Sequence, residues 1–222
     1  MREPNVKSAN HAQFFLSLLK NSAKATANKN TTLSLLIIMA LLCAGCVSSS
    51  QPADFYRLQP LAANAGETAS QLALGVGRIT LAEYLNRPQL QQNNGDFELH
   101  RSHQHRWAEP LESNIQRVVL ENLSRITGSD QVQSFPFRAD NRPQWVLHAN
   151  VLALDIITDK RAELRVDWQW QETVSGRYVK GQVSRFVQSA ESGPAAQAEA
   201  YSQLLLRWSQ AAADQITALN SL

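Results

Sequence analysis

The sequence predicts a single domain of the α+β class: an antiparallel or mixed sheet with two helices packed on one face. Two observations lead to this fold. Apolar and polar residues alternate strictly from Ala162 to Gln171, which is typical of a strand with one buried and one solvated face. Two other segments repeat apolar residues at three- and four-residue spacing, as helices that pack on a sheet do.

Five further strand segments follow from the same patterns. Ser175 and Gly176 turn the chain after the alternating strand, and Val179, Val183 and Val187 are expected to point inward on the return strand. In the Gly75–Gly77 stretch no lysine or third glycine follows, so we expect it to let a neighbouring segment come close rather than to bind phosphate. The other predicted strands are Asp54–Leu58, Leu72–Thr80, Phe97–Ser102 and Trp145–Ile156.

The two helices have clear boundaries. Pro110 suits a helix start, and an apolar stripe from Leu111 to Ile126 ends at Gly128, which suits a helix C-terminus. After Gly193 and Pro194, a final helix places apolar residues from Tyr201 to Leu219 on one side.

A lipoprotein signal peptide is expected to precede this fold. A polar, lysine-bearing leader leads into the uncharged run Leu33–Leu42, which is too short to cross a membrane as a helix. Small residues and a cysteine follow directly, as Ala44, Gly45 and Cys46. This ending resembles a bacterial lipobox, which implies cleavage before Cys46 and acylation of that cysteine; an ordinary signal with a free thiol is the alternative.

The expected organisation is therefore a signal peptide over 1–45, an acylated tether over 46–53 and a periplasmic domain over 54–222. Val47 is not the aspartate that commonly retains lipoproteins in the inner membrane, so the outer membrane is the expected location. Of the 21 basic and 19 acidic residues, 5 and 1 precede Cys46, so the mature chain carries 16 and 18 and a net charge of −2. This balance gives no support to nucleic-acid binding.

The mature sequence offers little for catalysis or cofactors. It has no nucleophile elbow, no spacing that singles out a catalytic triad and no cysteine beyond Cys46, so we expect no enzyme and no cofactor. His100, His103 and His105 are the one concentrated group, but on a regular strand only the last two share a face. Zinc needs three or four converging ligands, so no metal site is expected, although a metal-binding lipoprotein remains an alternative.

Two segments have the composition of a protein-binding surface. Tyr84, Leu85, Arg87 and Pro88 combine an aromatic, an arginine and a proline-stiffened turn, and neither Tyr84 nor Arg87 is assigned to the core. Arg106 and Trp107 stand at a helix entrance. Trp107 is better explained as a residue that fastens the helix to the core, with Arg106 paired to Glu109; for Tyr84 and Arg87 binding and structural roles stay equally open.

With these segments the mature chain resembles the ABC-type transport auxiliary lipoproteins, the family of paraquat-inducible protein C. The likeness rests on Phe55–Leu58, Gly75–Leu90, Arg106–Leu111 and the C-terminal helix. It implies a non-enzymatic, outer-membrane-anchored partner of an MCE-domain protein in lipid transport, acting singly or as a ring of copies. It also implies partner contacts at Tyr84, Leu85, Arg87, Pro88, Arg106 and Trp107. A structural or assembly lipoprotein of another envelope complex, such as a pilotin, is the alternative from a different class.

Overall fold

The computed structural model describes residues 33–34, 52–63, 71–93, 97–157, 160–179 and 181–220. Gln51–Leu222 forms one compact unit, which is described here by itself. Leu33 and Ser34 are helical. Cys46 and the rest of the leader lie outside the described residues, so cleavage and acylation stay predictions. Among the described residues, no helix combines the length and apolar character that a membrane span requires.

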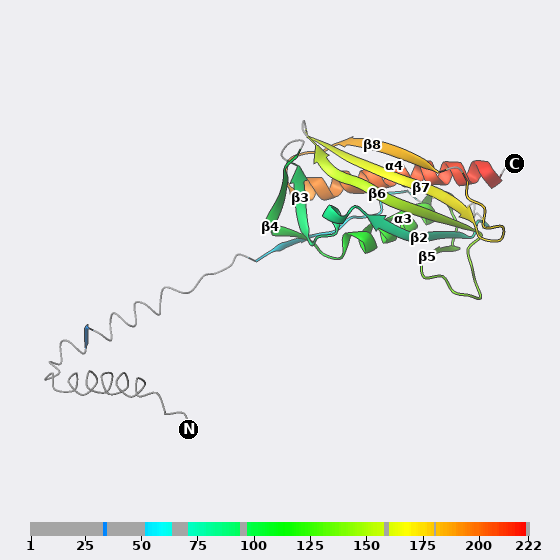
Figure 1. The fold of residues 1–222 in the computed structure, drawn as a ribbon, viewed down its shortest axis with the longest axis horizontal. Helices are drawn as coiled ribbons and strands as arrows, with labels where there is room; N and C mark the ends of the chain where they lie inside the picture. Colours follow the sequence, from blue (N-terminus) through cyan, green and yellow to red (C-terminus); the bar gives the residue numbers. More distant parts are fainter. Residues whose placement is uncertain are drawn as a thin grey trace, which may run out of the picture. The chain divides into compact units, whose positions relative to one another are not determined.

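A five-stranded mixed sheet forms the body of the domain (Figure 1). Its strand order is β5-β2-β6-β7-β8, and β2 runs parallel to both of its neighbours while β6, β7 and β8 are antiparallel. This arrangement confirms the predicted α+β class and mixed sheet. The strands are β2 Leu74–Leu81, β5 Val132–Ser134, β6 Trp145–Ile157, β7 Arg161–Glu172 and β8 Gln182–Ser189.

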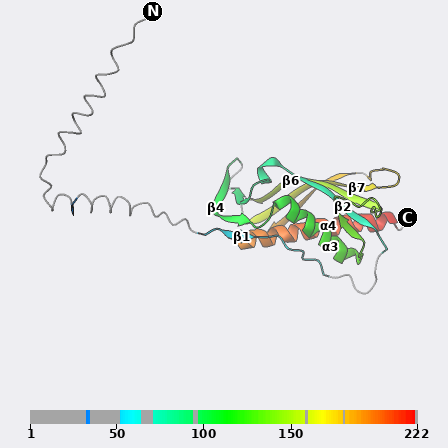
Figure 2. The same ribbon diagram turned by 90° about the horizontal axis from the view of Figure 1, so that it is seen from below.

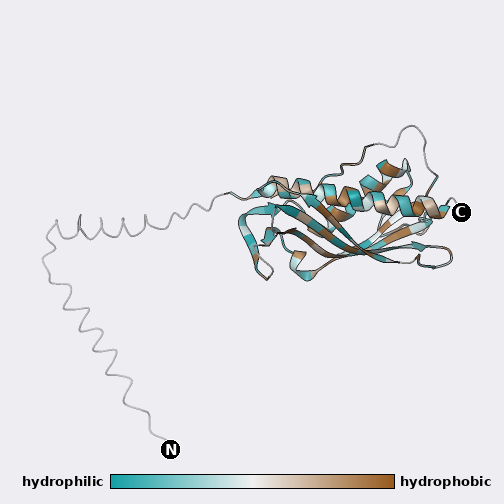
Figure 3. Ribbon diagram, turned by 90° about the horizontal axis from the view of Figure 1, so that it is seen from above, coloured by the Kyte–Doolittle hydropathy of each residue, from teal (hydrophilic) through white to brown (hydrophobic). Residues whose placement is uncertain are grey.

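Two helices, α3 Leu111–Thr127 and α4 Pro194–Asn220, cover one face of this sheet, as predicted. Hydrophobic and hydrophilic residues alternate along the strands, and the hydrophobic set packs against the helices (Figure 3). The indole N–H of Trp170 on β7 donates to the carbonyl of Ala212 on α4, at 3.1 Å. Gly128 ends α3 in the left-handed conformation, with φ of 66°.

A second, three-stranded sheet lies at one end of the domain, beside the first turns of α4 (Figure 2). Its order is β1-β4-β3, from β1 Asp54–Tyr56, β3 Gln89–Asn93 and β4 Leu99–Trp107. The sequence predicts β1 and part of β4 but neither β3 nor the separate sheet. The reason is that β4 is largely exposed and β3 is glutamine-rich, so neither shows the alternation of a half-buried strand.

The prediction that Val183 and Val187 point inward is wrong, whereas Val179 packs against the core as predicted. Gln171 bridges Tyr178, whereas Trp168 pairs with Gln182, so three steps along β7 face four steps along the returning chain. One extra residue in a strand exchanges its two faces. Val183 therefore pairs with Asp167 on the solvated side and is 64% exposed, while Phe186 pairs with Leu164 and packs against the core.

The expectation for Gly75 is confirmed. A Cβ atom at Gly75 would lie 2.6 Å from Pro143 and 2.8 Å from the ring of Phe137. The segment between β5 and β6 therefore packs directly on β2, and only glycine leaves it room.

Candidate functional site

The two segments with the composition of a binding surface lie side by side. Tyr84 and Leu85 belong to the short 3-10 helix η2 Glu83–Leu85, and Pro88 leads from it into β3. The backbone N–H of Trp107, the last residue of β4, donates to the carbonyl of Pro88 at 2.7 Å. Arg106 pairs with Gln89 across the same two strands. The antiparallel pairing of β3 and β4 thus unites residues that the sequence places in separate segments.

Two members of this group are part of the core. Leu85 is 5% exposed and Trp107 is 7% exposed. Trp107 stacks on Tyr201 of α4, with 6.2 Å between ring centroids. The structural explanation of Trp107 is therefore supported, and neither side chain is available to a partner.

Tyr84 is half-buried, which differs from the expectation that it lies outside the core. Its ring packs against the core, and its hydroxyl donates to Oδ2 of Asp155 on β6 at 2.7 Å. Burial raises the pKa of Tyr84, and the hydrogen bond to Asp155 raises it further because a phenolate would face a carboxylate. Burial also raises the pKa of Asp155, against the effect of the Tyr84 hydroxyl, which stabilises the carboxylate. Tyr84 therefore fixes η2 to the main sheet.

The remaining members, Arg87, Pro88 and Arg106, are exposed. Together with their exposed neighbours Glu83 and Asn86 they form what we call the Arg87–Arg106 surface. The Arg87 side chain is 47% exposed, and its Nη2 lies 3.9 Å from Oε1 of the exposed Glu83. Such an exposed pair contributes little and leaves the guanidinium free to exchange partners. Arg106 is expected to pair with Glu109. Instead, Oε1 of Glu109 lies 2.9 Å from Nη2 of Arg117.

A network of buried hydrogen bonds holds the strand next to this surface in place. The Gln197 side-chain amide donates to the carbonyl of Gln91 at 2.7 Å and to the hydroxyl of Tyr201 at 3.0 Å. That hydroxyl donates in turn to the carbonyl of Leu154 at 3.1 Å. The network joins β3, α4 and β6 by hydrogen bonds. It therefore fixes the position of β3, the strand that follows Arg87 and Pro88. Its members are far apart in the sequence and follow no spacing that could have identified them.

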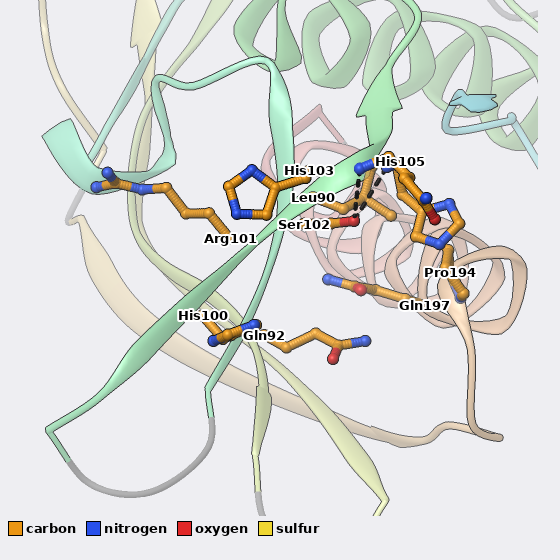
Figure 4. A pocket seen from close by; sticks show the side chains of 10 residues that line it. Leu90, Gln92, His100, Arg101, Ser102, His103, His105, Pro194 and Gln197 are labelled. Atoms are coloured by element: carbon orange, nitrogen blue, oxygen red, sulfur yellow. Dashed lines mark hydrogen bonds between the residues drawn. The ribbon is translucent and has the colours of Figure 1, made fainter. Parts of the chain in front are cut away.

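The histidine run lines a different hollow, a cavity of about 450 Å³ between β4 and the start of α4 (Figure 4). Two steps of β3, Gln89 to Gln91, face five steps of β4, Arg106 to Arg101, so β4 bulges there. Ser102 Oγ accepts the backbone N–H of His105 at 3.0 Å within this bulge. The regular alternation that would align two histidines is therefore lost.

The three imidazoles do not converge. Figure 4 shows His100, His103 and His105 spread around the wall of the cavity. His105 Nδ1 lies 3.3 Å from the hydroxyl oxygen of Tyr56, on β1. In the part of the chain that the structure describes, no three His, Cys, Asp or Glu side chains are grouped to hold a metal ion. The absence of a metal site stays a prediction.

These features define a single-domain α+β module that presents exposed arginines beside buried core side chains. The family model of the ABC-type transport auxiliary lipoprotein component matches residues 56–217. The chain therefore belongs to the ABC-type transport auxiliary lipoprotein family, as the resemblance of its motifs indicates. This is a family of transport auxiliary lipoproteins and not of enzymes.

Two solved structures show the same fold at low sequence identity. An uncharacterized protein is 19% identical with a TM-score of 0.62, over 75% of this chain and 99% of the other. A DUF330 protein from Xanthomonas campestris is 17% identical with a TM-score of 0.61, over 72% of this chain and 93% of the other. The PelC dodecamer from Paraburkholderia phytofirmans is 12% identical with a TM-score of 0.42, over 66% of this chain and 93% of the other. No curated protein matches the sequence.

Proposed function

We propose that this protein is an outer-membrane-anchored auxiliary lipoprotein of an MCE/ABC-type lipid transport system. In this role it docks the periplasm-spanning MCE-domain component at the membrane. Membership of the transport auxiliary family supports the auxiliary role. The observation that carries the docking role is the meeting of the Tyr84–Pro88 and Arg106–Trp107 segments in one surface.

The Arg87–Arg106 surface has the properties of a docking site. Arginine is enriched in binding hot spots because its planar guanidinium makes several directed hydrogen bonds at once. Pro88 and the hydrogen bond from Trp107 fix the backbone between the two arginines. The base beneath them is built from buried Leu85 and Trp107. A surface that is ordered before binding loses less conformational entropy when the partner arrives.

The anchor sets how far this domain reaches from the membrane. Cleavage before Cys46 leaves seven residues between the acylated cysteine and the start of β1 at Asp54, so eight residue steps separate the two. A fully extended chain of that length spans at most about 28 Å. The tether therefore holds the domain within reach of the membrane surface, where a component that spans the periplasm has to end.

The test is a double charge reversal, Arg87→Glu with Arg106→Glu. We expect capture of the MCE-domain partner to weaken by about 2–4 kcal/mol, roughly thirty- to a thousand-fold in affinity, as for a pair of hot-spot residues. The melting temperature should change little because both side chains are exposed. Tyr84 is unsuitable for this test because its removal would leave the half-buried Asp155 without its hydrogen-bond donor.

The matched control is Arg138→Glu with Arg177→Glu, which changes the net charge equally at two exposed positions near the other end of β6. This control should capture the partner as the wild type does. Equal capture by both variants and the wild type would show that docking does not use the Arg87–Arg106 surface. Equal loss in both variants would reduce the effect to overall charge.

A further inference from the structure

A second surface feature lies at the other end of β6, away from the Arg87–Arg106 surface. It is a groove of about 540 Å³ beneath the segment that joins β5 to β6, the long loop that hangs from the sheet in Figure 1. His148 lines the groove, whereas Asp155, which holds Tyr84, lies seven residues further along β6. Seven residues of strand span about 23 Å. The groove is thus separate from the proposed docking site.

The groove lies on the face of the sheet that the helices leave open. Leu147 pairs with Trp170, and Trp170 is bonded to α4, so this pair faces the helices. Val146 and His148 flank Leu147 along β6 and therefore point to the opposite side. Both line the groove.

Glycine and aromatic residues shape its walls. Gly77 lies in the floor, where a Cβ atom would be 3.0 Å from the carbonyl oxygen of Leu147 and 3.1 Å from Nδ1 of His148. Phe135 and Phe137 form an apolar wall and meet edge to face, with 5.9 Å between ring centroids. Phe135 is an exposed large apolar side chain, so this wall is open to a ligand.

The charge of the groove is one-sided. Its lining includes Arg78 and Arg142 but no aspartate or glutamate. The guanidinium carbon of Arg78 lies 5.5 Å from the ring centroid of Phe135, which places a cation directly against the apolar wall. Asp140 and Glu172, on neighbouring segments, are paired elsewhere, with Arg138 at 3.3 Å and Arg177 at 3.8 Å. Because the mature chain would carry a net charge of −2, this local excess of positive charge is not a general property of the protein.

We infer that the groove binds the anionic head group of a phospholipid together with the adjoining part of one acyl chain. We assign the phosphate to Arg78 and Arg142, because a guanidinium group can donate two parallel N–H bonds to phosphate oxygens. The chain lies against Phe135, Phe137 and Val146. The volume fits this part of a lipid, since small-ligand sites occupy about 300–1,000 Å³. This inference goes beyond the proposed docking function and does not depend on it.

The backbone around the groove favours a lipid over an acidic peptide. β2 and β6 are paired on both sides, so neither offers a free edge to an added strand. The N–H of Phe135 already donates to the carbonyl of Val76, and that of Thr173 donates to the carbonyl of Gln144. A bound peptide would have to satisfy its own backbone polar groups there, whereas an acyl chain has none.

The test is native mass spectrometry of the mature protein in a neutral detergent, titrated with dioleoyl phosphatidylglycerol. We expect a complex with one lipid and binding about tenfold tighter than that of dioleoyl phosphatidylcholine, whose head group is neutral overall. Arg78→Gln with Arg142→Gln should remove this preference, and Phe135→Ser should weaken binding while both arginines remain. Arg57→Gln with Arg101→Gln removes the same charge at two exposed positions that do not line the groove, so it is the matched control and should bind as the wild type does.

Three results would overturn the inference. The first is equal binding of the two lipids, or equal binding by the Arg78 and Arg142 variant and the wild type. The second is binding of glycerol 1-phosphate as tight as that of phosphatidylglycerol, which would reduce the groove to a simple anion site. The third is displacement of phosphatidylglycerol by a peptide of alternating glutamate and phenylalanine at lower concentration than by the lipid itself, which would assign the groove to peptides.

Discussion

Leu204→Ala is expected to lower the free energy of unfolding by about 2–5 kcal/mol. Leu204 is fully buried in α4 and belongs to the same core cluster as Trp168 of β7, so its truncation leaves a cavity between helix and sheet. Urea denaturation followed by far-UV circular dichroism measures this quantity directly.

Val183→Ala serves as the control and also tests the register of β8. Val183 is a large aliphatic residue like Leu204, but it lies on the solvated face of the sheet. Its replacement should change the free energy of unfolding by less than about 0.5 kcal/mol. A loss of stability as large as that of Leu204→Ala would mean that Val183 points inward. The returning chain would then pair with β7 without an extra residue between Val179 and Gln182.

Cys46→Ser is expected to remove the protein from the membrane fraction or to leave an uncleaved precursor. The lipobox interpretation makes this cysteine the site of acylation, and each buried methylene of an acyl chain contributes about 0.8 kcal/mol to membrane binding. Cell fractionation with immunoblotting gives both the location and the size of the product. Separation of the two membranes in the same experiment tests the expected outer-membrane location.

Cys43→Ser is the control for this experiment, because Cys43 is the other cysteine of the chain and precedes the expected cleavage site. This variant should be cleaved and anchored as the wild type is. A Cys46→Ser protein that is processed to the wild-type size and still sediments with the outer membrane would exclude acylation of Cys46 as the anchor.

Much of the fold follows from local patterns. The alternation over Ala162–Gln171 predicts β7, and the stripe that ends at Gly128 predicts α3, because burial of one face imposes a period on the sequence. β3 escapes such reasoning because its glutamine-rich sequence lacks an apolar alternation. The side to which Val183 points could not be predicted either. One extra residue in the pairing exchanges the two faces of a strand, and no local sequence pattern reveals it.

The sequence predicts the candidate site only in part, for a similar reason. Residue types identify both the Tyr84–Pro88 and the Arg106–Trp107 segments, but their meeting depends on the pairing of β3 with β4. The bond from Tyr84 to Asp155 joins residues 71 positions apart, on elements that no pattern places together. Composition therefore locates the surface, and only the tertiary structure separates its exposed arginines from the residues that support them.

The most direct test of the proposed function is the identity of the protein that touches this one in the cell envelope. Chemical cross-linking in intact cells, followed by purification from membranes and mass spectrometry, compares the wild type with the Arg87→Glu, Arg106→Glu variant. We expect an MCE-domain protein to be the main cross-linked partner of the wild type and to be depleted in the variant. Recovery of a secretin or another assembly machine instead, with no MCE-domain protein, would contradict the proposal and support the role of a pilotin.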